Sequence, residues 1–194
     1  QTKNKKIIVS LNMMRLGFPL FKFEKIIDMM INILDPKELA IQSYSNFDSN
    51  NPRVFYKYTS PVTKNLSSLS KEAFRKNPQL RLLSPTHSFI VFKANKEIYN
   101  YIFTSAFGKN SIFEYFYKNN YFWLNIGCYL NETCTFMHHV EALNANLINY
   151  RKNEKFPVMI FEERDCKESK LIQYEYFTKV KSLNFMHSWI PIQN

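Results

Sequence analysis

The spacing of hydrophobic positions changes along the chain, and each change marks a predicted element. A short β-branched run at residues 5–11 predicts a buried strand, and the apolar positions of residues 21–34 follow the period of a helix. Asp35-Pro36 ends that helix, because a residue that precedes proline avoids the helical region. Residues 38–45 predict a second strand. A strand, a helix and a strand within about 40 residues predict a βαβ unit with two parallel strands.

The rest of the pattern predicts further short elements. Residues 46–66 are polar and contain two prolines, so we predict a long loop, and loops of this length are often functional. The predicted helices are 68–78, 95–107 and 111–120, the predicted strands are 84–93, 121–130, 147–151, 156–163 and 171–180, and a charged turn is predicted at 162–170. We therefore predict one α/β domain over residues 1–194, in a three-layer or mixed α+β arrangement. Its central mixed sheet begins with a parallel βαβ unit, adds antiparallel strands later and carries helices on both faces.

Composition narrows the class of protein. Of the 194 residues 45% are hydrophobic and only 22% are charged, which predicts a folded core rather than disorder. No apolar run reaches the roughly 18–20 residues of a transmembrane helix, and no secretory signal precedes the first strand, so we predict no membrane insertion. Three cysteines without such a signal indicate a reducing cytoplasm rather than a disulfide framework. Residue 1 is Gln rather than Met, so we expect the chain to be truncated at one end or both.

The net charge of +10 favours anionic partners such as phosphates, nucleotide-linked compounds, nucleic acid or an acidic membrane surface. Solubility alone explains the charge equally well. We predict no nucleic-acid partner, because the lysines are scattered and the aromatic residues lie in apolar runs that indicate a core. The three glycines can form neither a G-x-G-x-x-G nor a G-x-x-x-x-G-K loop, which excludes a Rossmann dinucleotide site and a P-loop.

Residues 131–142, NETCTFMHHVEA, hold the densest group of potentially reactive side chains. They contain no C-x-x-C or H-E-x-x-H spacing, so we predict no metal site. Cys134 and His138 share a helical face, but a cysteine beside a strand end is more often a small buried hydrophobe than a nucleophile. Thr135, His138 and Glu141 also share a face, which suits a general base with a carboxylate and a hydroxyl donor. Spacing alone does not favour this chemistry over an ordinary capped helix.

The order of motifs around this stretch changes the interpretation. T-x-x-H-x-x-E at residues 135–141 follows the strand and glycine of WLNIGCYLNETC and precedes NLINYR. Upstream lie IIVSLNMMRLG, LSKEAFRKNPQLRLLSPTHSFIVF and FGKNSIFE. In this order the motifs resemble the aminoglycoside 3-N-acetyltransferase family over about residues 6–151. The resemblance implies an acetyl-CoA-dependent N-acetyltransferase whose fold is not that of the GNAT acetyltransferases, with acetyl-CoA as co-substrate and no metal.

The resemblance also implies the roles of individual residues. His138 would deprotonate the acceptor amine, Glu141 would orient or assist it, and Thr135 would stabilise the tetrahedral oxyanion. An ammonium must lose a proton before it attacks a thioester, and histidine titrates near neutral pH, which suits that step. The family's upstream acidic position would fall on Asn131 or Glu132, as substrate-binding residues. Cys134 and His139 are expected to matter less than these residues. Cys134 would be a bystander. The substitution His138→Ala would abolish acetyl transfer, whereas His139→Ala would have a much smaller effect.

The cofactor-binding residues follow from two turns of the family. The segment SPTHSF at residues 84–89 and the strand-one turn at residues 10–17 resemble the parts that line the CoA channel. The first of the family's turns reads H-S-S-L, where this chain has S-L-N-M. The residues implied to bind CoA are Ser10, Asn12, Arg81, Ser84, His87 and Ser88.

The acceptor is predicted from charge. A polycationic aminoglycoside calls for a carboxylate-rich cleft, whereas this chain has 26 Lys and Arg against 16 Asp and Glu. We therefore predict an amino sugar on a nucleotide or glycan precursor, as in surface polysaccharide biosynthesis. The first alternative is an aminoglycoside 3-N-acetyltransferase that confers antibiotic resistance. The second is a catalytically inactive homologue that binds CoA or sugar. A monomer or a homodimer is expected.

Overall fold

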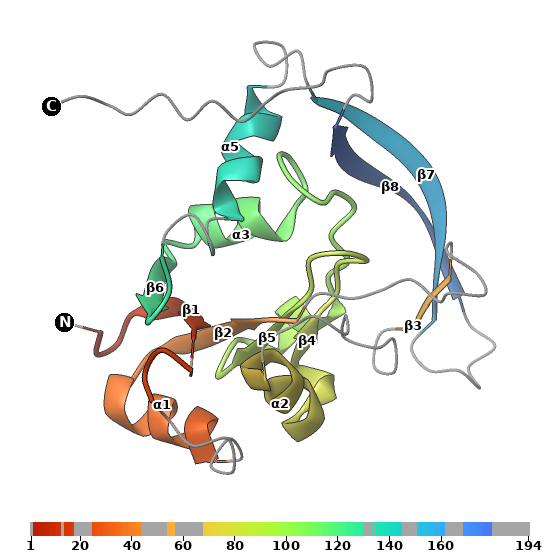
Figure 1. Cartoon of the computed structure of the whole chain (residues 1–194). Coiled ribbons are helices and arrows are strands. Elements are labelled where there is room, and N and C mark those ends of the chain that lie inside the picture. Colours follow the sequence, from red (N-terminus) through yellow and green to blue (C-terminus); the bar gives the residue numbers. More distant parts are fainter. Residues whose placement is uncertain are drawn as a thin grey trace, which may run out of the picture.

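Two β-sheets and four α-helices make up the described part of the chain (Figure 1). The computed structural model describes residues 2–12, 14–17, 25–43, 54–56, 68–129, 133, 135–144, 151–161 and 169–179. The larger sheet has the order β4-β5-β2-β1-β6. Its strands are β1 (Lys6–Leu11), β2 (Glu38–Gln42), β4 (Arg81–Leu82), β5 (Phe89–Phe92) and β6 (Phe122–Ile126).

The strand directions of the larger sheet confirm the predicted mixed topology. β1 lies parallel to β2 on one side and parallel to β6 on the other. β5 is antiparallel to both β2 and β4. The predicted βαβ unit is therefore present. The helix α1 (Ile26–Leu34) links the first two strands and ends at Asp35, whose φ of 42° stops it as predicted.

The smaller sheet has the order β3-β7-β8. β7 (Arg151–Phe161) and β8 (Ser169–Lys179) form a long antiparallel pair, and β3 (Val54–Tyr56) adds to β7 in parallel. The backbone of Glu175 bonds this sheet to the segment that precedes α3. Its carbonyl accepts a hydrogen bond from Ala106 N–H at 2.8 Å, and its N–H donates to Thr104 O at 2.9 Å. Residues near the end of the chain thus lie beside the segment that precedes α3.

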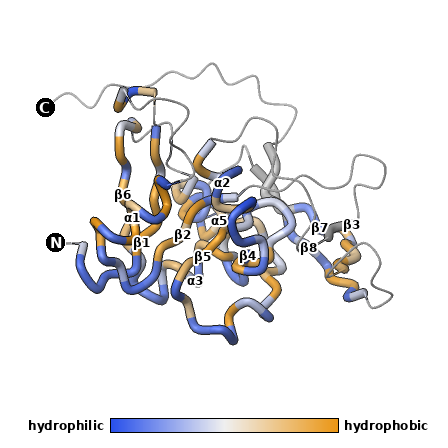
Figure 2. The backbone as a smooth tube through the Cα atoms, turned by 90° about the horizontal axis from the view of Figure 1, so that it is seen from below, coloured by the Kyte–Doolittle hydropathy of each residue, from blue (hydrophilic) through white to orange (hydrophobic). Residues whose placement is uncertain are grey.

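Helices cover both faces of the larger sheet, as predicted. α1 and α2 (Ser68–Lys76) bury Ile27, Met30 and Leu69 against one face. α3 (Ile112–Lys118), α5 (Phe136–Leu143) and the smaller sheet lie over the other face. Most positions of β1, β2 and β5 are hydrophobic and buried, which is expected of strands that are covered on both faces (Figure 2).

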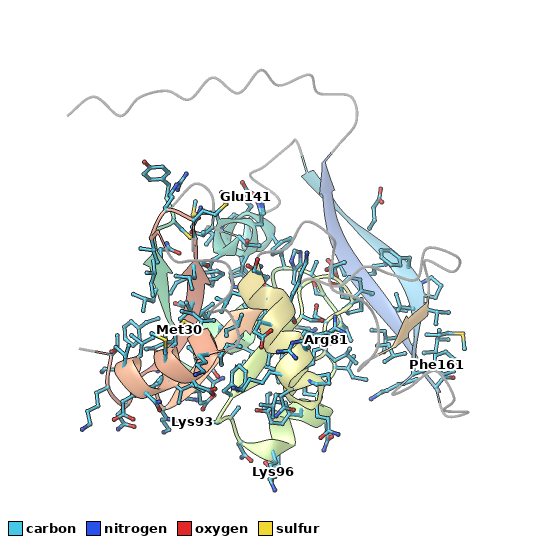
Figure 3. All side chains as sticks on the ribbon, turned by 60° about the horizontal axis from the view of Figure 1, so that its bottom comes forward. Met30, Arg81, Lys93, Lys96, Glu141 and Phe161 are labelled. Atoms are coloured by element: carbon cyan, nitrogen blue, oxygen red, sulfur yellow. The ribbon has the colours of Figure 1, made fainter. Side chains whose placement is uncertain are left out.

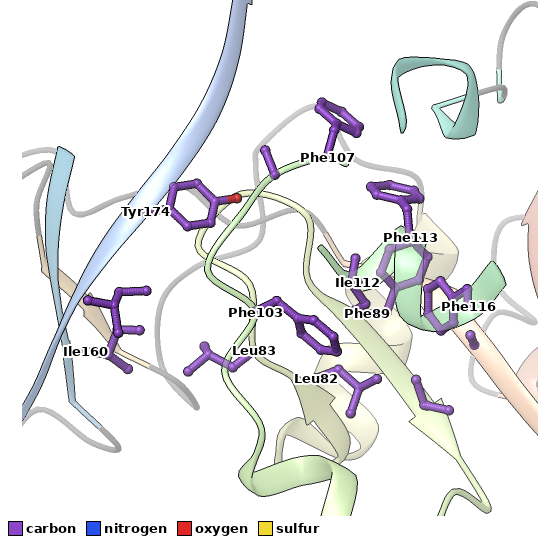
Figure 4. Close-up of a cluster of buried hydrophobic side chains, with 14 of the residues drawn as sticks. Leu82, Leu83, Phe89, Phe103, Phe107, Ile112, Phe113, Phe116, Ile160 and Tyr174 are labelled. Atoms are coloured by element: carbon purple, nitrogen blue, oxygen red, sulfur yellow. The ribbon is translucent and has the colours of Figure 1, made fainter. Parts of the chain in front are cut away.

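The hydrophobic core on the face covered by α3, α5 and the smaller sheet positions the candidate site. Phe89 of β5, Phe113 and Phe116 of α3 and Tyr174 of β8 point into one cluster (Figure 4). The Phe89 ring meets those of Phe113 and Phe116 edge to face, with the centroids of Phe89 and Phe116 4.8 Å apart. Such pairs add to the stabilisation from buried apolar area. Residues separated by 85 positions along the chain therefore share one rigid support.

Two secondary-structure predictions are wrong. Residues 95–107 form a short 3-10 helix, Lys96–Asn100, and then an extended segment rather than a long helix. The reason is tertiary: Phe103 N–H bonds to Leu83 O, and Ser105 bridges to Glu175, so the backbone pairs with strands instead of with itself. The predicted loop at residues 46–66 contains the strand β3, which pairs with a distant partner; the rest of that stretch lies outside the described residues.

Other elements differ in extent or burial. β6 is a strand as predicted but lies at the edge of its sheet, and Phe122 is 56% exposed rather than buried. The predicted strands at 147–151 and 156–163 are one strand within the described range, because β7 continues through Lys152 to Lys155 against β8. Sequence spacing did not predict β4, which has two residues. Within the described ranges, no helix has the length and apolar character that a membrane span needs.

Candidate active site

His138 and Glu141 form a hydrogen-bonded pair on α5, one turn apart. His138 Nδ1 lies 2.7 Å from Glu141 Oε2. The His138 side chain is 38% exposed and that of Glu141 is 21% exposed, so the pair lies at the surface of the helix rather than in the core. A carboxylate at this distance accepts the Nδ1 proton of a neutral imidazole and leaves the ring lone pair on Nε2. The arrangement suits removal of a proton from a substrate that approaches Nε2.

His139 has a different environment from its neighbour. Its side chain is buried, with 2% exposure, and its Nδ1 accepts a hydrogen bond from Gly108 N–H at 3.2 Å. Ser111 Oγ lies 3.4 Å from the same nitrogen. Burial lowers the pKa of His139, and the nearby Glu114 carboxylate opposes part of that shift. The two adjacent histidines therefore differ in role: one faces outward beside a carboxylate, and the other is held inside.

Thr135 stands at the N-terminal end of α5, one turn before His138. Its carbonyl accepts the His138 N–H at 3.1 Å, and its own N–H donates to Thr133 O at 2.8 Å. The Thr135 side chain is partly buried. All three predicted catalytic residues thus lie on α5 or at its N-cap, which is Thr135. Asn131 and Glu132, the predicted substrate-binding residues, lie outside the described residues.

His87 lies close to the candidate base through Phe107. The Phe107 ring centroid is 4.5 Å from that of His87 and 5.4 Å from that of His138, which it meets edge-on. Burial lowers the pKa of His87 to about 3, and the neighbouring His138 adds to the shift. His87 is therefore neutral over the working pH range and adds no charge to the site.

The serines beside His87 hold its turn in place. Ser88 Oγ donates to the Ser84 carbonyl at 2.5 Å, and Ser84 N–H donates to Ser88 Oγ at 3.4 Å. Ser84 Oγ also lies 3.3 Å from the hydroxyl of Tyr174, which reaches in from β8. Both serines are fully buried. Their contacts organise the segment that the sequence predicted to line the CoA channel, and their part in CoA binding stays a prediction.

Arg81 lies on the opposite side of the sheet from His138. Its register partner is Ile90, which packs against α1 and α2, and its guanidinium lies 4.7 Å from the centre of the Phe74 ring. Figure 3 shows Arg81 beside α2 and Glu141 on α5, on separate parts of the molecule. Burial lowers the pKa of Arg81 to about 9. The structure does not bring this predicted CoA-binding residue to the His138 pair.

Ser10 and Asn12 lie at the carboxyl end of β1. Ser10 Oγ accepts a hydrogen bond from Trp123 Nε1 at 2.8 Å. Asn12 Oδ1 accepts the Arg15 N–H at 3.3 Å and so stabilises the turn that follows β1. Ligands of open α/β sheets bind at such carboxyl ends. Both residues have structural contacts, and their predicted contact with CoA remains a prediction.

Sequence reasoning missed two contributors to the site. The first is the start of FGKNSIFE, which in the sequence served only as a sign of family resemblance. In the structure Phe107 touches both His87 and His138, and Gly108 and Ser111 contact His139. The glycine and serine of this stretch, placed between two aromatic-rich segments, were the sequence signal that could have indicated its role. Tyr174 was also missed, and no local signal identifies it, since its contacts to Ser84 and Thr86 span almost 90 residues.

A pocket of about 430 Å³ lies beside the N-terminal end of α5, between α3 and β6. Aromatic rings and amide groups line most of it, and none of the predicted site residues does. It is therefore a feature distinct from the His138–Glu141 pair. Its lining residues are Ile8, Phe116, Tyr117, Asn120, Tyr121, Phe122, Trp123, Asn125, Thr133 and Phe136.

The described side chains offer no group of three or more His, Cys, Asp or Glu residues close enough together to hold a metal ion. Cys134, the cysteine of residues 131–142, lies outside the described part of the chain.

Several solved structures share this fold. AAC-VIa with bound sisomicin is 12% identical with a TM-score of 0.69, over 91% of this chain and 70% of that one. AAC-IIIb in a binary complex with CoASH is 18% identical with a TM-score of 0.68, over the same shares. The YokD protein from Bacillus subtilis is 16% identical with a TM-score of 0.65, over 90% of this chain and 75% of that one. At these identities the likeness shows the fold.

Sequence comparison identifies the family. No curated protein sequence matches the chain. The family model of the aminoglycoside 3-N-acetyltransferases matches residues 41–186, three quarters of the chain. This match confirms the predicted resemblance and the prediction of an enzyme that uses acetyl-CoA as co-substrate. The chain belongs to the aminoglycoside 3-N-acetyltransferase family, and it is a CoA-dependent N-acetyltransferase.

Proposed function

We propose that the enzyme transfers the acetyl group of acetyl-CoA to a primary amine of an aminoglycoside-type amino sugar, with His138 as general base. The observation that carries the proposal is the 2.7 Å contact between His138 Nδ1 and Glu141 Oε2 on a partly exposed helical face. With Nδ1–H bonded to the carboxylate, Nε2 is the basic atom. The carboxylate also stabilises the imidazolium that forms when the amine loses its proton.

The reaction needs no covalent enzyme intermediate. The acceptor ammonium gives a proton to His138 Nε2, and the neutral amine attacks the thioester carbonyl. The carbonyl oxygen gains negative charge, and Thr135 is the nearest hydroxyl along the helix to stabilise it. The tetrahedral species then expels the CoA thiolate, which takes up the second proton of the amine nitrogen, and the imidazolium of His138 releases its proton to solvent. Phe107 and the neutral His87 form an apolar border beside His138 that favours the neutral form of an incoming amine.

The comparisons favour a different acceptor from the one that the bulk charge of the chain predicts. The family match and the sisomicin complex of AAC-VIa favour an aminoglycoside over the nucleotide-linked amino sugar that bulk charge predicted. No comparison supports a place in surface polysaccharide synthesis. A net charge of +10 describes the whole chain and does not define the charge around one cleft.

A steady-state assay of thiol release tests the proposal. We expect the wild-type enzyme to turn over acetyl-CoA with sisomicin, and His138→Ala to lower kcat by about 10²–10⁴-fold, the usual range for a general base. Met137→Ala is the matched control, because Met137 is its exposed neighbour on the same helix and should leave kcat unchanged. Full activity in His138→Ala would overturn the role of the base. Turnover of a nucleotide-linked amino sugar, with none of sisomicin, would overturn the acceptor.

A further inference from the structure

The helix that carries the candidate base is held in the protein by a histidine. All eight residues of α5 are described, and His139 is the only buried one among them. A helix of this length is positioned by tertiary packing rather than by its own propensity. An imidazole that replaces an apolar side chain in this role is costly to bury unless its nitrogens are hydrogen-bonded. Its hydrogen bonds therefore matter for where α5 lies.

The hydrogen bond of His139 requires one particular form of the ring. Gly108 N–H points at Nδ1 from 3.2 Å, so Nδ1 is the acceptor and the proton of the neutral ring is on Nε2. Ser111 Oγ lies 3.4 Å from Nδ1 and donates its own hydrogen to Gly108 O at 2.7 Å. The hydrogen bond from Ser111 Oγ to Gly108 O closes the turn that presents the Gly108 N–H. We call residues 107–111 the docking turn.

The docking turn approaches α5 very closely. Gly108 has a φ of +72°, and a Cβ built on it would lie 3.4 Å from the Cβ of Ala142. Ala142 is three residues after His139, so the two share a helical face. The turn thus contacts α5 at two successive positions of one face, once through a hydrogen bond and once through direct packing.

The same turn also touches the candidate base. Phe107 meets the His138 ring edge-on at 5.4 Å and stacks on Phe113 of the core at 5.2 Å. His138 and His139 are about 100° apart around the helix axis, so a rotation of α5 that breaks the Gly108 bond also moves His138. One rigid turn therefore supports both histidines.

We propose that His139 is a positioning residue for acetyl transfer: its Nδ1 bond to Gly108 N–H fixes the rotation of α5, and with it the direction of His138 Nε2. The inference rests on the proposed function of His138. Displacement of a base by about 1 Å costs on the order of 10²-fold in rate. None of the residues predicted to bind CoA lies on α5 itself, so we expect a rotation of α5 to leave their contacts with CoA largely intact. The signature is therefore a fall in kcat with little change in the KM for acetyl-CoA.

Three substitutions separate positioning from simple packing. His139→Phe keeps a ring but removes the acceptor, and we expect kcat to fall about 10-fold or more. His139→Asn keeps an acceptor two bonds from Cβ, as Nδ1 is, and should restore kcat to within about threefold of wild type. His139→Gln moves the acceptor one bond further and should resemble His139→Phe; it replaces that variant if the latter does not fold. All are assayed well below their melting temperatures.

A measurement without turnover tests the hydrogen bond itself. Histidine ring NMR should show Nδ1 of His139 unprotonated and Nε2 protonated in the wild type, and amide exchange of Gly108 should accelerate in His139→Phe and recover in His139→Asn. Wild-type kcat in His139→Phe, or an Asn variant as slow as the Phe variant, would overturn the positioning role. A wild-type enzyme without acetyl transfer would overturn the proposed function, and the positioning role with it, while the Gly108 exchange would still report whether the bond forms.

Discussion

At the scale of single residues, neighbours in the sequence differ because one packs inward and the other does not. His138 is 38% exposed and bonded to Glu141, whereas His139 is buried and bonded to a backbone amide. The buried, neutral His87 packs against Phe107, which also contacts His138. Two predictions belong to this scale, one for the carboxylate of Glu141 and one for the buried ring of His87.

Glu141→Gln tests the carboxylate of the pair. The amide of glutamine still accepts a hydrogen bond from Nδ1–H but carries no charge to stabilise the imidazolium. We expect kcat to fall about 10-fold, less than in His138→Ala, with the KM for acetyl-CoA nearly unchanged. Glu97→Gln, at an exposed position away from α5, is the control for loss of one negative charge. A Glu141 variant with the kinetics of the control would remove Glu141 from the mechanism.

The buried His87 predicts an acid-sensitive fold. Its pKa is about 3 in the folded protein against an ordinary value near 6.5, so the unfolded chain binds a proton that the folded chain does not. The free energy of unfolding should therefore decrease as the pH falls from about 6.5 toward 3, with a slope approaching about 1.4 kcal/mol per pH unit from this group. Above pH 6.5 this contribution is constant.

Urea unfolding at a series of pH values measures that slope. In His87→Leu the slope between pH 6.5 and 3 should be smaller by about one proton, whatever the absolute stability of the variant. The exposed position Lys93, replaced by Gln, provides a control that should leave the slope unaltered. An identical slope in His87→Leu and wild type would show that His87 titrates normally.

At the scale of elements, close approaches of backbone determine how the site-bearing segments meet. The docking turn approaches α5 at Gly108, and the end of β6 approaches the end of β1 at Gly127. Gly127 has a φ of +65°, and a Cβ there would lie 2.9 Å from the carbonyl oxygen of Asn12. This contact fixes how the end of β6 lies against the turn that follows β1.

Gly127→Ala and Gly17→Ala form a matched pair. Both glycines have a left-handed φ, of +65° and +68°, so both variants incur the same backbone strain of about 1 kcal/mol. Only Gly127 faces a backbone oxygen; among the described residues no atom lies within 4 Å of a Cβ at Gly17. We expect Gly127→Ala to lower the free energy of unfolding by about 2 kcal/mol more than Gly17→Ala. Equal losses, measured by urea unfolding, would contradict the close approach.

At the scale of the whole molecule, the excess of positive charge is expected to act with opposite sign on acetyl-CoA and on the proposed aminoglycoside acceptor. The net charge is +10, CoA is anionic and an aminoglycoside is polycationic. The field attracts the donor and repels the acceptor, except where local carboxylates such as Glu141 reverse it. Salt screens both effects, because charges more than about 8–10 Å apart interact weakly at physiological ionic strength.

Steady-state kinetics at low and high salt measures this field. Between about 20 and 200 mM NaCl the KM for acetyl-CoA should rise about threefold, and the KM for sisomicin should fall. Acetyl-pantetheine, an uncharged thioester donor, is the control, and its KM should stay constant. A salt response shared by acetyl-CoA and acetyl-pantetheine would show that the field of the protein is not responsible.

Sequence patterns by themselves predicted the parallel start of the sheet and the helices around residues 26–34, 68–76 and 112–118, because local periodicity and end signals depend on short-range interactions. The order of the motifs predicted the family, and the role of His138 is a prediction that follows from that resemblance. Only the tertiary structure decided that residues 101–107 are extended and that Val54–Tyr56 form a strand, because both pair with strands far along the chain.

The same distinction applies to the site. The spacing of Thr135, His138 and Glu141 was visible in the sequence, since residues three apart on a helix share a face. The separation of Arg81 from His138, the burial of His139 against Gly108, and the reach of Tyr174 to Ser84 were not visible. The contacts of His139 with Gly108 and of Tyr174 with Ser84 join residues that are 31 and 90 positions apart, and no local pattern specifies which segments will pack together.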